Sequence, residues 1–274
     1  MDPIIQALVM GIVQGLTEFL PISSSGHLIL VPWLLGFNDP FLDSLAFSVV
    51  LHGGTLLALL VYFRDDWRRL IPAGLAALRD RSFRNDPDRR LAWLLVASTV
   101  PAAIIAVFLN DWIEQNVRQV GLVAVMLVIA GAVLWTADRW GPRTHTIARL
   151  TFRGAIGIGA AQALALIPGV SRSGISMSAA LFAGLDRADT ARYSFLMATP
   201  ITALAVAYEL FKIVRGDAGQ VEIGPLVVGV TAAFVSGILA IAGLLRYVRT
   251  RSFNVFVVYR IAFAVVVLAV FLAR

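Results

Sequence analysis

Two short polar segments each interrupt an apolar stretch of the sequence, and both carry residue types that handle phosphate groups. The first segment, residues 14–27, contains an amide, a carboxylate, three consecutive serines, a glycine and a histidine: Gln14, Glu18, Ser23, Ser24, Ser25, Gly26 and His27. The second segment, residues 168–176, contains one arginine among small residues: Ser171, Arg172, Ser173, Gly174 and Ser176. Arginine matches phosphate oxygens with a planar bidentate fork, and a serine hydroxyl beside a base can act as a nucleophile. The two segments together favour phosphoryl transfer.

The elements that position these residues belong to a membrane protein. Residues of the AVILMFWYC set make up 59% of the 274-residue chain, and charged residues only 15%, against about 25% charged in a soluble domain. The net charge of +6 comes from basic residues in the loops between apolar runs. That pattern sets membrane topology, and we predict no nucleic-acid partner. The chain has no cysteine, which excludes disulfides and cysteine nucleophiles.

Hydropathy predicts an all-α integral membrane protein with six transmembrane helices. They are residues 41–63, 91–109, 120–136, 194–211, 223–245 and 254–273. Two further apolar stretches, residues 3–37 and 154–185, are each divided by one of the polar segments. Each half is only about 10–17 residues, too short to cross a bilayer alone. We therefore expect two re-entrant helix–loop–helix hairpins, whose irregular tips must lie inside protein or beside a wet cavity.

The basic residues predict the orientation. Residues 64–90 contain eight Lys or Arg, residues 137–153 four, residues 186–193 two and residues 246–253 three. The opposite loops and the C-terminus contain four, so the richer side is predicted to be cytoplasmic and both termini to lie outside.

An internal repeat connects the two polar segments. A shift of 148 residues aligns them without a gap, so that Gln14 falls on Gln162, Ser23 on Ser171 and Ser25 on Ser173. We predict a single membrane domain of two repeats, residues 1–148 and 149–274, each with one hairpin and three spans. An odd number of spans inverts the second repeat, so the two tips should meet near the bilayer midplane. Ser24, which aligns with Arg172, should then approach it to within about 8 Å, near-attack geometry for one phosphoryl group.

Two other intramembrane residues are predicted to be structural. We expect His52 to form a helix–helix hydrogen bond. Arg260 is expected to reach the interface or to pair with Glu209.

The motifs Gln14–His27 and Pro168–Ser176 resemble those of the undecaprenyl-diphosphatase, or bacitracin-resistance, family of bacterial inner membranes. The resemblance covers essentially the whole chain. It implies hydrolysis of a C55 isoprenyl diphosphate to the monophosphate, which recycles the lipid carrier for peptidoglycan and other envelope polymers. It also implies a divalent cation, Mg²⁺ or Ca²⁺. Many members carry Glu where this chain has Gln14, and Ser176 replaces the last Thr of the second motif.

On this basis we expect catalytic roles for Glu18, Ser24, His27 and Arg172. Ser24 is the predicted nucleophile with His27 as its base, and attack by metal-bound water with Glu18 as base is the alternative. Glu18 and Gln14 are the expected metal ligands. The phosphates should be held by hydroxyls and by backbone N–H groups at half-helix N-termini, at Ser23, Ser25, Gly26, Ser171, Ser173, Gly174 and Ser176.

A second hypothesis, which the inverted repeat also allows, is a transporter or flippase of a phosphorylated polyprenyl lipid. The resemblance favours a multi-pass inner-membrane protein whose site opens to the outer face. The partners expected are the lipid diphosphate and membrane lipids, and a homodimer is one option that the sequence leaves open.

Overall fold

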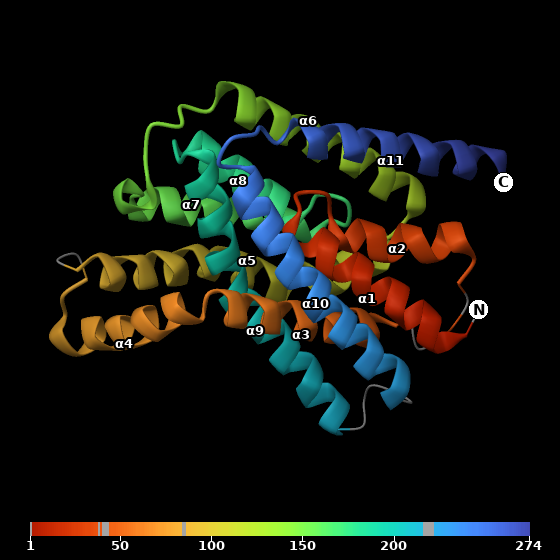
Figure 1. Ribbon diagram of the computed structural model, residues 1–274, viewed down its shortest axis with the longest axis horizontal. Helices are drawn as coiled ribbons and strands as arrows, with labels where there is room; N and C mark the ends of the chain where they lie inside the picture. Colours follow the sequence, from red (N-terminus) through yellow and green to blue (C-terminus); the bar gives the residue numbers. More distant parts are fainter. Residues whose placement is uncertain (1, 38, 40–43, 84–85, 216–221) are drawn as a thin grey trace.

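The computed structural model describes residues 2–37, 39, 44–83, 86–215 and 222–274, and these residues form an almost entirely helical fold (Figure 1). The α-helices are α1 (Pro3–Phe19), α2 (Ser24–Leu35), α3 (Leu45–Tyr62), α4 (Arg64–Asp80), α5 (Pro87–Asn116), α6 (Val120–Trp140), α7 (Phe152–Gln162), α8 (Arg172–Phe182), α9 (Arg187–Arg215), α10 (Ile223–Tyr247) and α11 (Asn254–Ala273). Two 3-10 helices, η1 (Ile147–Arg149) and η2 (Ala163–Leu166), complete the order. Within the described residues no strand forms beyond one isolated bridge between His145 and Leu185.

Four of the described helices are long and apolar enough to cross a membrane. They are residues 87–109 of α5, and α6, α10 and α11 in full. A fifth crossing results if α3 and α4, which meet at a bend of 84°, are counted as one span. The chain is therefore a multi-pass membrane protein, as its composition predicts.

Two of the predicted spans have a different form in the structure. The span predicted at residues 41–63 corresponds to α3, which begins at Leu45, and residues 41–43 lie outside the described residues. The span predicted at residues 194–211 lies within the longer α9. The α9 segment is helical, but it is not among the four spans that length and composition define.

The basic segment 64–90, predicted only as a loop, contains the helix α4. The charged residues Arg64, Asp65 and Asp66 open this helix immediately after the apolar α3. Charged side chains are costly in the hydrocarbon core, so the chain turns sharply where they begin. An ion pair of Arg69 with Asp88 of α5 then joins the two arms of the α4–α5 hairpin, which projects from the body in Figure 1.

Helix ends fall at both polar interruptions, with the same local geometry at each. Ser23 caps α2 with φ 78°, and its hydroxyl accepts a hydrogen bond from Gly26 N at 3.2 Å. Ser171 caps α8 with φ 76°, and its hydroxyl accepts from Gly174 N at 3.1 Å. A positive φ is uncommon outside glycine. Two serines 148 residues apart in sequence thus share an unusual backbone conformation at the start of a half-helix.

Small residues let the first helix of each hairpin pack closely on a long helix. Figure 1 shows α1 crossing α10, where a Cβ on Gly15 would lie 2.0 Å from Ser236 Oγ and 2.4 Å from Ala233 O. The corresponding contact of α7 is with α5, where a Cβ on Gly159 would lie 2.0 Å from Ser98 O. Such small-residue contacts are the usual way for membrane helices to approach closely. They fix the height at which α1 and α7 end, and therefore the position of both tips.

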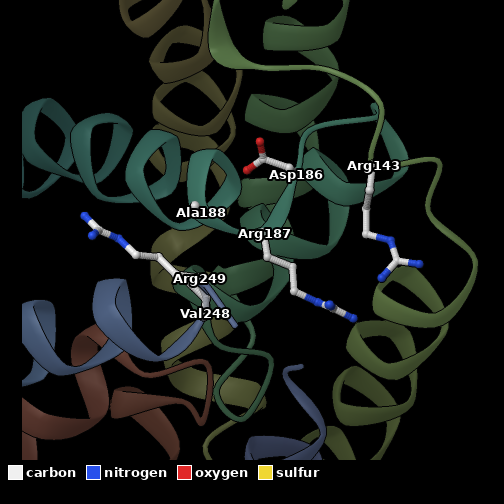
Figure 2. A pocket seen from close by; sticks show the side chains of 6 residues that line it. All are labelled: Arg143, Asp186, Arg187, Ala188, Val248 and Arg249. Carbon is white, nitrogen blue, oxygen red and sulfur yellow. The ribbon is translucent and has the colours of Figure 1, made fainter. Parts of the chain in front are cut away.

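Three of the basic loops meet at one end of the molecule, where buried Asp138 joins two of them. Its carboxylate accepts hydrogen bonds from Arg187 Nε at 2.5 Å and from Phe253 N at 3.0 Å. Figure 2 shows an adjoining pocket lined by Arg143, Arg187 and Arg249, one from each loop. The guanidinium groups point in different directions rather than toward one point, so this pocket is a basic surface and not a convergent site.

Candidate active site

A single buried carboxylate, Glu18 at the end of α1, lies at the centre of the candidate site. Glu18 as a whole residue is only 5% exposed. Glu18 Oε2 accepts hydrogen bonds from Ser24 Oγ at 2.5 Å and from Gln14 Nε2 at 3.1 Å. Glu18 Oε1 accepts from Arg172 Nη2. The two polar segments, more than 140 residues apart in sequence, therefore meet on the two oxygens of one side chain.

Arg172, the first residue of α8, connects this carboxylate to α9. Its Nη1 donates to Thr202 Oγ1 and, at 3.4 Å, to Ala198 O. The guanidinium thus uses both arms of its fork, one on α1 and one on α9. An isolated charge in such a place would be strongly unfavourable, and the ion pair with Glu18 compensates both charges.

Ser24 and Arg172 lie on opposite sides of the Glu18 carboxylate. Two groups that hydrogen-bond to the two oxygens of one carboxylate are within about 8 Å of each other, the separation that the repeat predicts. The short hydrogen bond from Ser24 makes Glu18 the acceptor that is placed to take the serine proton.

His27 is not placed to act as the base for Ser24, contrary to the sequence prediction. Its Nδ1 is 2.7 Å from Ser23 O, and its Nε2 is 2.9 Å from the hydroxyl of Tyr259 on α11. The ring also stacks on Phe263 with centroids 4.4 Å apart. His27 lies three residues after Ser24, but its ring turns toward α11, where aromatic packing and two hydrogen bonds hold it. It orients α2 against α11.

His52 on α3 belongs to the site, although the sequence predicted only a structural role for it. Its Nε2 lies 3.4 Å from Glu18 Oε2, and its Nδ1 lies 2.7 Å from Ser48 O. The expected helix–helix contact forms, but its partner is the central carboxylate. A signal was present in the sequence, because Ser48, His52 and Thr55 are spaced by four and three residues and form a polar stripe on an apolar helix.

The remaining predicted phosphate-binding residues divide into framework and cavity positions. Ser173 Oγ donates to Leu20 O and so connects the second tip to the first break. Ser176 Oγ donates to Arg172 O at 2.7 Å and is 2.6 Å from Ser194 Oγ, within helix packing. Gly26 packs against the second tip, since a Cβ there would lie 3.4 Å from the Gly169 Cα. Of the predicted serines, Ser25 lines an open cavity.

This cavity, of about 140 Å³, adjoins the central carboxylate. Its polar lining consists of Ser25, Ser48, His52 and Arg118, and Leu166 and Pro168 contribute part of its apolar wall. A water molecule occupies about 30 Å³ in the liquid, so a phosphate-sized group can enter. His52 both lines the cavity and contacts Glu18, so the cavity lies directly beside the site.

Arg260 on α11 holds the two tips in place. This arginine is fully buried and neither reaches an interface nor needs an acidic partner. It donates to Pro21 O at the first break, to Gly169 O and Val170 O at the second, and to Leu127 O on α6. The predicted structural role is thus performed through backbone carbonyls, and the side chain of Glu209 lies outside the described residues.

The site offers a partial set of ligands for a divalent cation. Gln14 Oε1 is buried and has no hydrogen-bond partner, so an acceptor oxygen beside the Glu18 carboxylate is left unsatisfied. Among the described residues, no group of three His, Cys, Asp or Glu side chains is placed to hold a metal ion. A small oxygen-preferring cation fits this set, because Mg²⁺ commonly takes one or two carboxylates together with substrate phosphates.

The fold and the site together define a multi-pass helical membrane protein in which a serine and an arginine, both partly buried, meet on a buried carboxylate. The chain belongs to the family described as bacitracin resistance protein BacA, which it matches over residues 7–266. Relatives called undecaprenyl-diphosphatase align with this chain over nearly their full length. The protein of Gemmatimonas aurantiaca is 47% identical over 98% of both chains, and that of Geobacter sulfurreducens is 47% identical over 99% of both. The protein of Desulforudis audaxviator is 45% identical over 98% of both.

Proposed function

We propose that this protein hydrolyses undecaprenyl diphosphate to undecaprenyl phosphate and inorganic phosphate. The reaction recycles the lipid carrier for peptidoglycan and other envelope polymers, and it would confer resistance to bacitracin. The observation that carries the proposal is that Ser24 and Arg172 both contact Glu18. Ser24 is the nucleophile, Arg172 binds the phosphate and Glu18 accepts the proton. The names and family of the relatives support the choice of substrate.

The reaction begins with Ser24. Its hydroxyl gives its proton to Glu18 while the oxygen attacks the terminal phosphorus of the diphosphate. A bond forms between Ser24 Oγ and phosphorus, and the bond from phosphorus to the bridging oxygen breaks, with its electron pair going to the departing monophosphate. Arg172 stabilises the charge that develops on the phosphoryl oxygens. Glu18 passes that proton to the departing lipid monophosphate. Water then attacks the phosphoserine and gives a proton to Glu18, the bond from phosphorus to Ser24 Oγ breaks, and Oγ takes this proton back as inorganic phosphate leaves.

A divalent cation is part of this proposal, with Glu18 and Gln14 to hold it. When bound, such an ion neutralises negative charge on the diphosphate and stabilises the leaving oxygen. The unsatisfied Gln14 Oε1 supports this assignment.

We further propose six spans and two opposed re-entrant hairpins in an inverted repeat. The matching helix caps at Ser23 and Ser171 support this arrangement. So does the packing between repeats, because α1 of the first repeat packs on α10 of the second, and α7 of the second packs on α5 of the first. In this arrangement the basic loops of Figure 2 face the cytoplasm of an inner membrane. Arg118, which follows the end of α5 remote from these loops, lines the cavity and supports a site that serves the outer face. One chain supplies every residue of the site, so a homodimer is not required for catalysis.

The test is phosphate release by purified protein in detergent, without a second compartment. We expect undecaprenyl diphosphate to yield inorganic phosphate with Mg²⁺ or Ca²⁺ present. A flippase would release none under these conditions, and that result would refute the proposal. A Glu18→Gln protein prepared in parallel controls for contaminating phosphatases.

A further inference from the structure

We propose that His52 is a ligand of the divalent cation at this site, through its Nε2 and beside Glu18 Oε2. The inference rests on the proposed function for the presence of a cation, but it concerns a residue outside both sequence motifs. It makes the cation site a contact between α1 and α3 rather than a feature of α1 alone.

The hydrogen bond of the other ring nitrogen sets the orientation of His52. A backbone carbonyl can only accept, so Nδ1, 2.7 Å from Ser48 O, carries the proton. Nε2 points toward Glu18 Oε2. With the ring proton on Nδ1, Nε2 has a lone pair free for a cation that lies between it and the carboxylate. Metal-bound histidines almost always donate their second N–H to a carbonyl or carboxylate in this way.

The separation of the two atoms suits neighbouring ligands of one ion. Nε2 and Oε2 are 3.4 Å apart. Nitrogen and oxygen ligands lie about 2.0–2.2 Å from small divalent cations, so adjacent ligands are roughly 3–3.5 Å apart. The ion pair with Arg172 involves Oε1, whereas Oε2, which accepts from Ser24 and Gln14, faces His52.

Two more polar atoms lie at the same place. Gln14 Nε2 is 3.1 Å from Glu18 Oε2, and the oxygen of that amide has no partner. Rotation of the amide by half a turn exchanges its oxygen and nitrogen, which puts a third ligand beside Oε2. The donor set is then one carboxylate, one imidazole and one amide oxygen, and the diphosphate supplies the remaining positions.

The ion can reach this position from the cavity. The His52 side chain is 27% exposed and lines the cavity with Ser25 and Ser48. A cation there lies between the incoming diphosphate and Glu18, so His52 would help to set the position of the diphosphate relative to Ser24.

An imidazole ligand also predicts which ions bind best. Calcium and magnesium prefer oxygen, whereas nitrogen ligands favour transition-metal ions. We therefore expect the wild-type protein to bind Mn²⁺ more tightly than Ca²⁺. Replacement of His52 by Gln, which offers oxygen, should reduce that preference.

The experiment is Mn²⁺ binding to the full chain in detergent, measured by electron paramagnetic resonance, together with spin-echo modulation to detect a coordinated nitrogen. For His52→Gln we expect the nitrogen modulation to disappear and Mn²⁺ affinity to fall by about tenfold or more. His145→Gln is the matched control, because His145 lies in the loop after α6, far from Glu18 in the fold, and should change neither signal. His52→Leu gives a second, ligand-free variant whose folding is checked by its melting curve.

Unchanged nitrogen modulation and unchanged Mn²⁺ affinity in both His52 variants would overturn the inference. That result would leave the proposed function in place if the wild-type protein still releases phosphate. If instead the wild-type protein binds Mn²⁺ through His52 but releases no phosphate from the lipid diphosphate, the proposed function fails and the cation site remains.

Discussion

Replacement of Arg172 by lysine tests whether the guanidinium geometry, rather than its charge, supports catalysis. Arg172 reaches Glu18 with Nη2 and Thr202 and Ala198 with Nη1, so one planar group spans α1 and α9. Lysine has a single ammonium group and cannot keep both sets of contacts while it also binds phosphate. Loss of one preorganised donor from a buried site that stabilises developing charge costs on the order of 10²–10³ in rate.

The assay is phosphate release at saturating and at limiting lipid diphosphate, so that kcat and KM are separated. We expect kcat to fall by about 10²–10³ and KM to rise less, because the lost contact acts mainly in the transition state. Arg192→Lys is the matched control, since Arg192 pairs with Asp66 at the basic end of the molecule and should retain wild-type turnover. An Arg172→Lys protein within about threefold of wild-type kcat would refute the reasoning.

Four further predictions concern the framework. Gly15→Leu should destabilise the protein by about 1–3 kcal/mol or more, because the leucine side chain would overlap α10. The measurement is the melting temperature in detergent, which should fall. Gly243→Leu is the control, because Gly243 faces open space. Arg260→Met should also lower the melting temperature, since it removes the donor to the carbonyls of Pro21, Gly169 and Val170 at the two tips. An unchanged melting temperature would contradict the role given to Arg260. His27→Gln should lower the melting temperature and have only a small effect on kcat. A loss of kcat as large as that of Glu18→Gln would show that His27 is the base. Cysteines introduced at Ser82 and Glu222 should be labelled from opposite faces by an impermeant reagent in intact cells, and equal labelling would exclude the proposed topology.

The sequence predicted the breaks and the tips because both depend on local chemistry. Proline, glycine and serine runs cannot continue an apolar helix, so the end of α1 at Phe19, just before Pro21, follows directly from composition. The end of α7 at Gln162 does not, because apolar residues follow it as far as Ile167. The inverted repeat requires the two tips to meet, which is why Glu18 and Arg172 could be placed together before any coordinates.

The partners of the histidines could not be predicted, because they depend on how helices rotate against one another. His27 is near Ser24 in sequence, but α11 supplies Tyr259 and Phe263 as better neighbours. His52 is 34 residues from Glu18 in sequence, and only the packing of α3 beside α1 brings them together. Spacing along one helix describes a face, but it does not say which helix that face meets.

The central claim is that Ser24, with Glu18 as its base, breaks the diphosphate bond. The most direct test is the rate of inorganic phosphate release from undecaprenyl diphosphate by purified Ser24→Ala protein whose melting temperature matches wild type. Removal of a true nucleophile should slow release by about a thousandfold or more. Release at close to the wild-type rate would contradict the account and would leave water, activated by Glu18, as the attacking group.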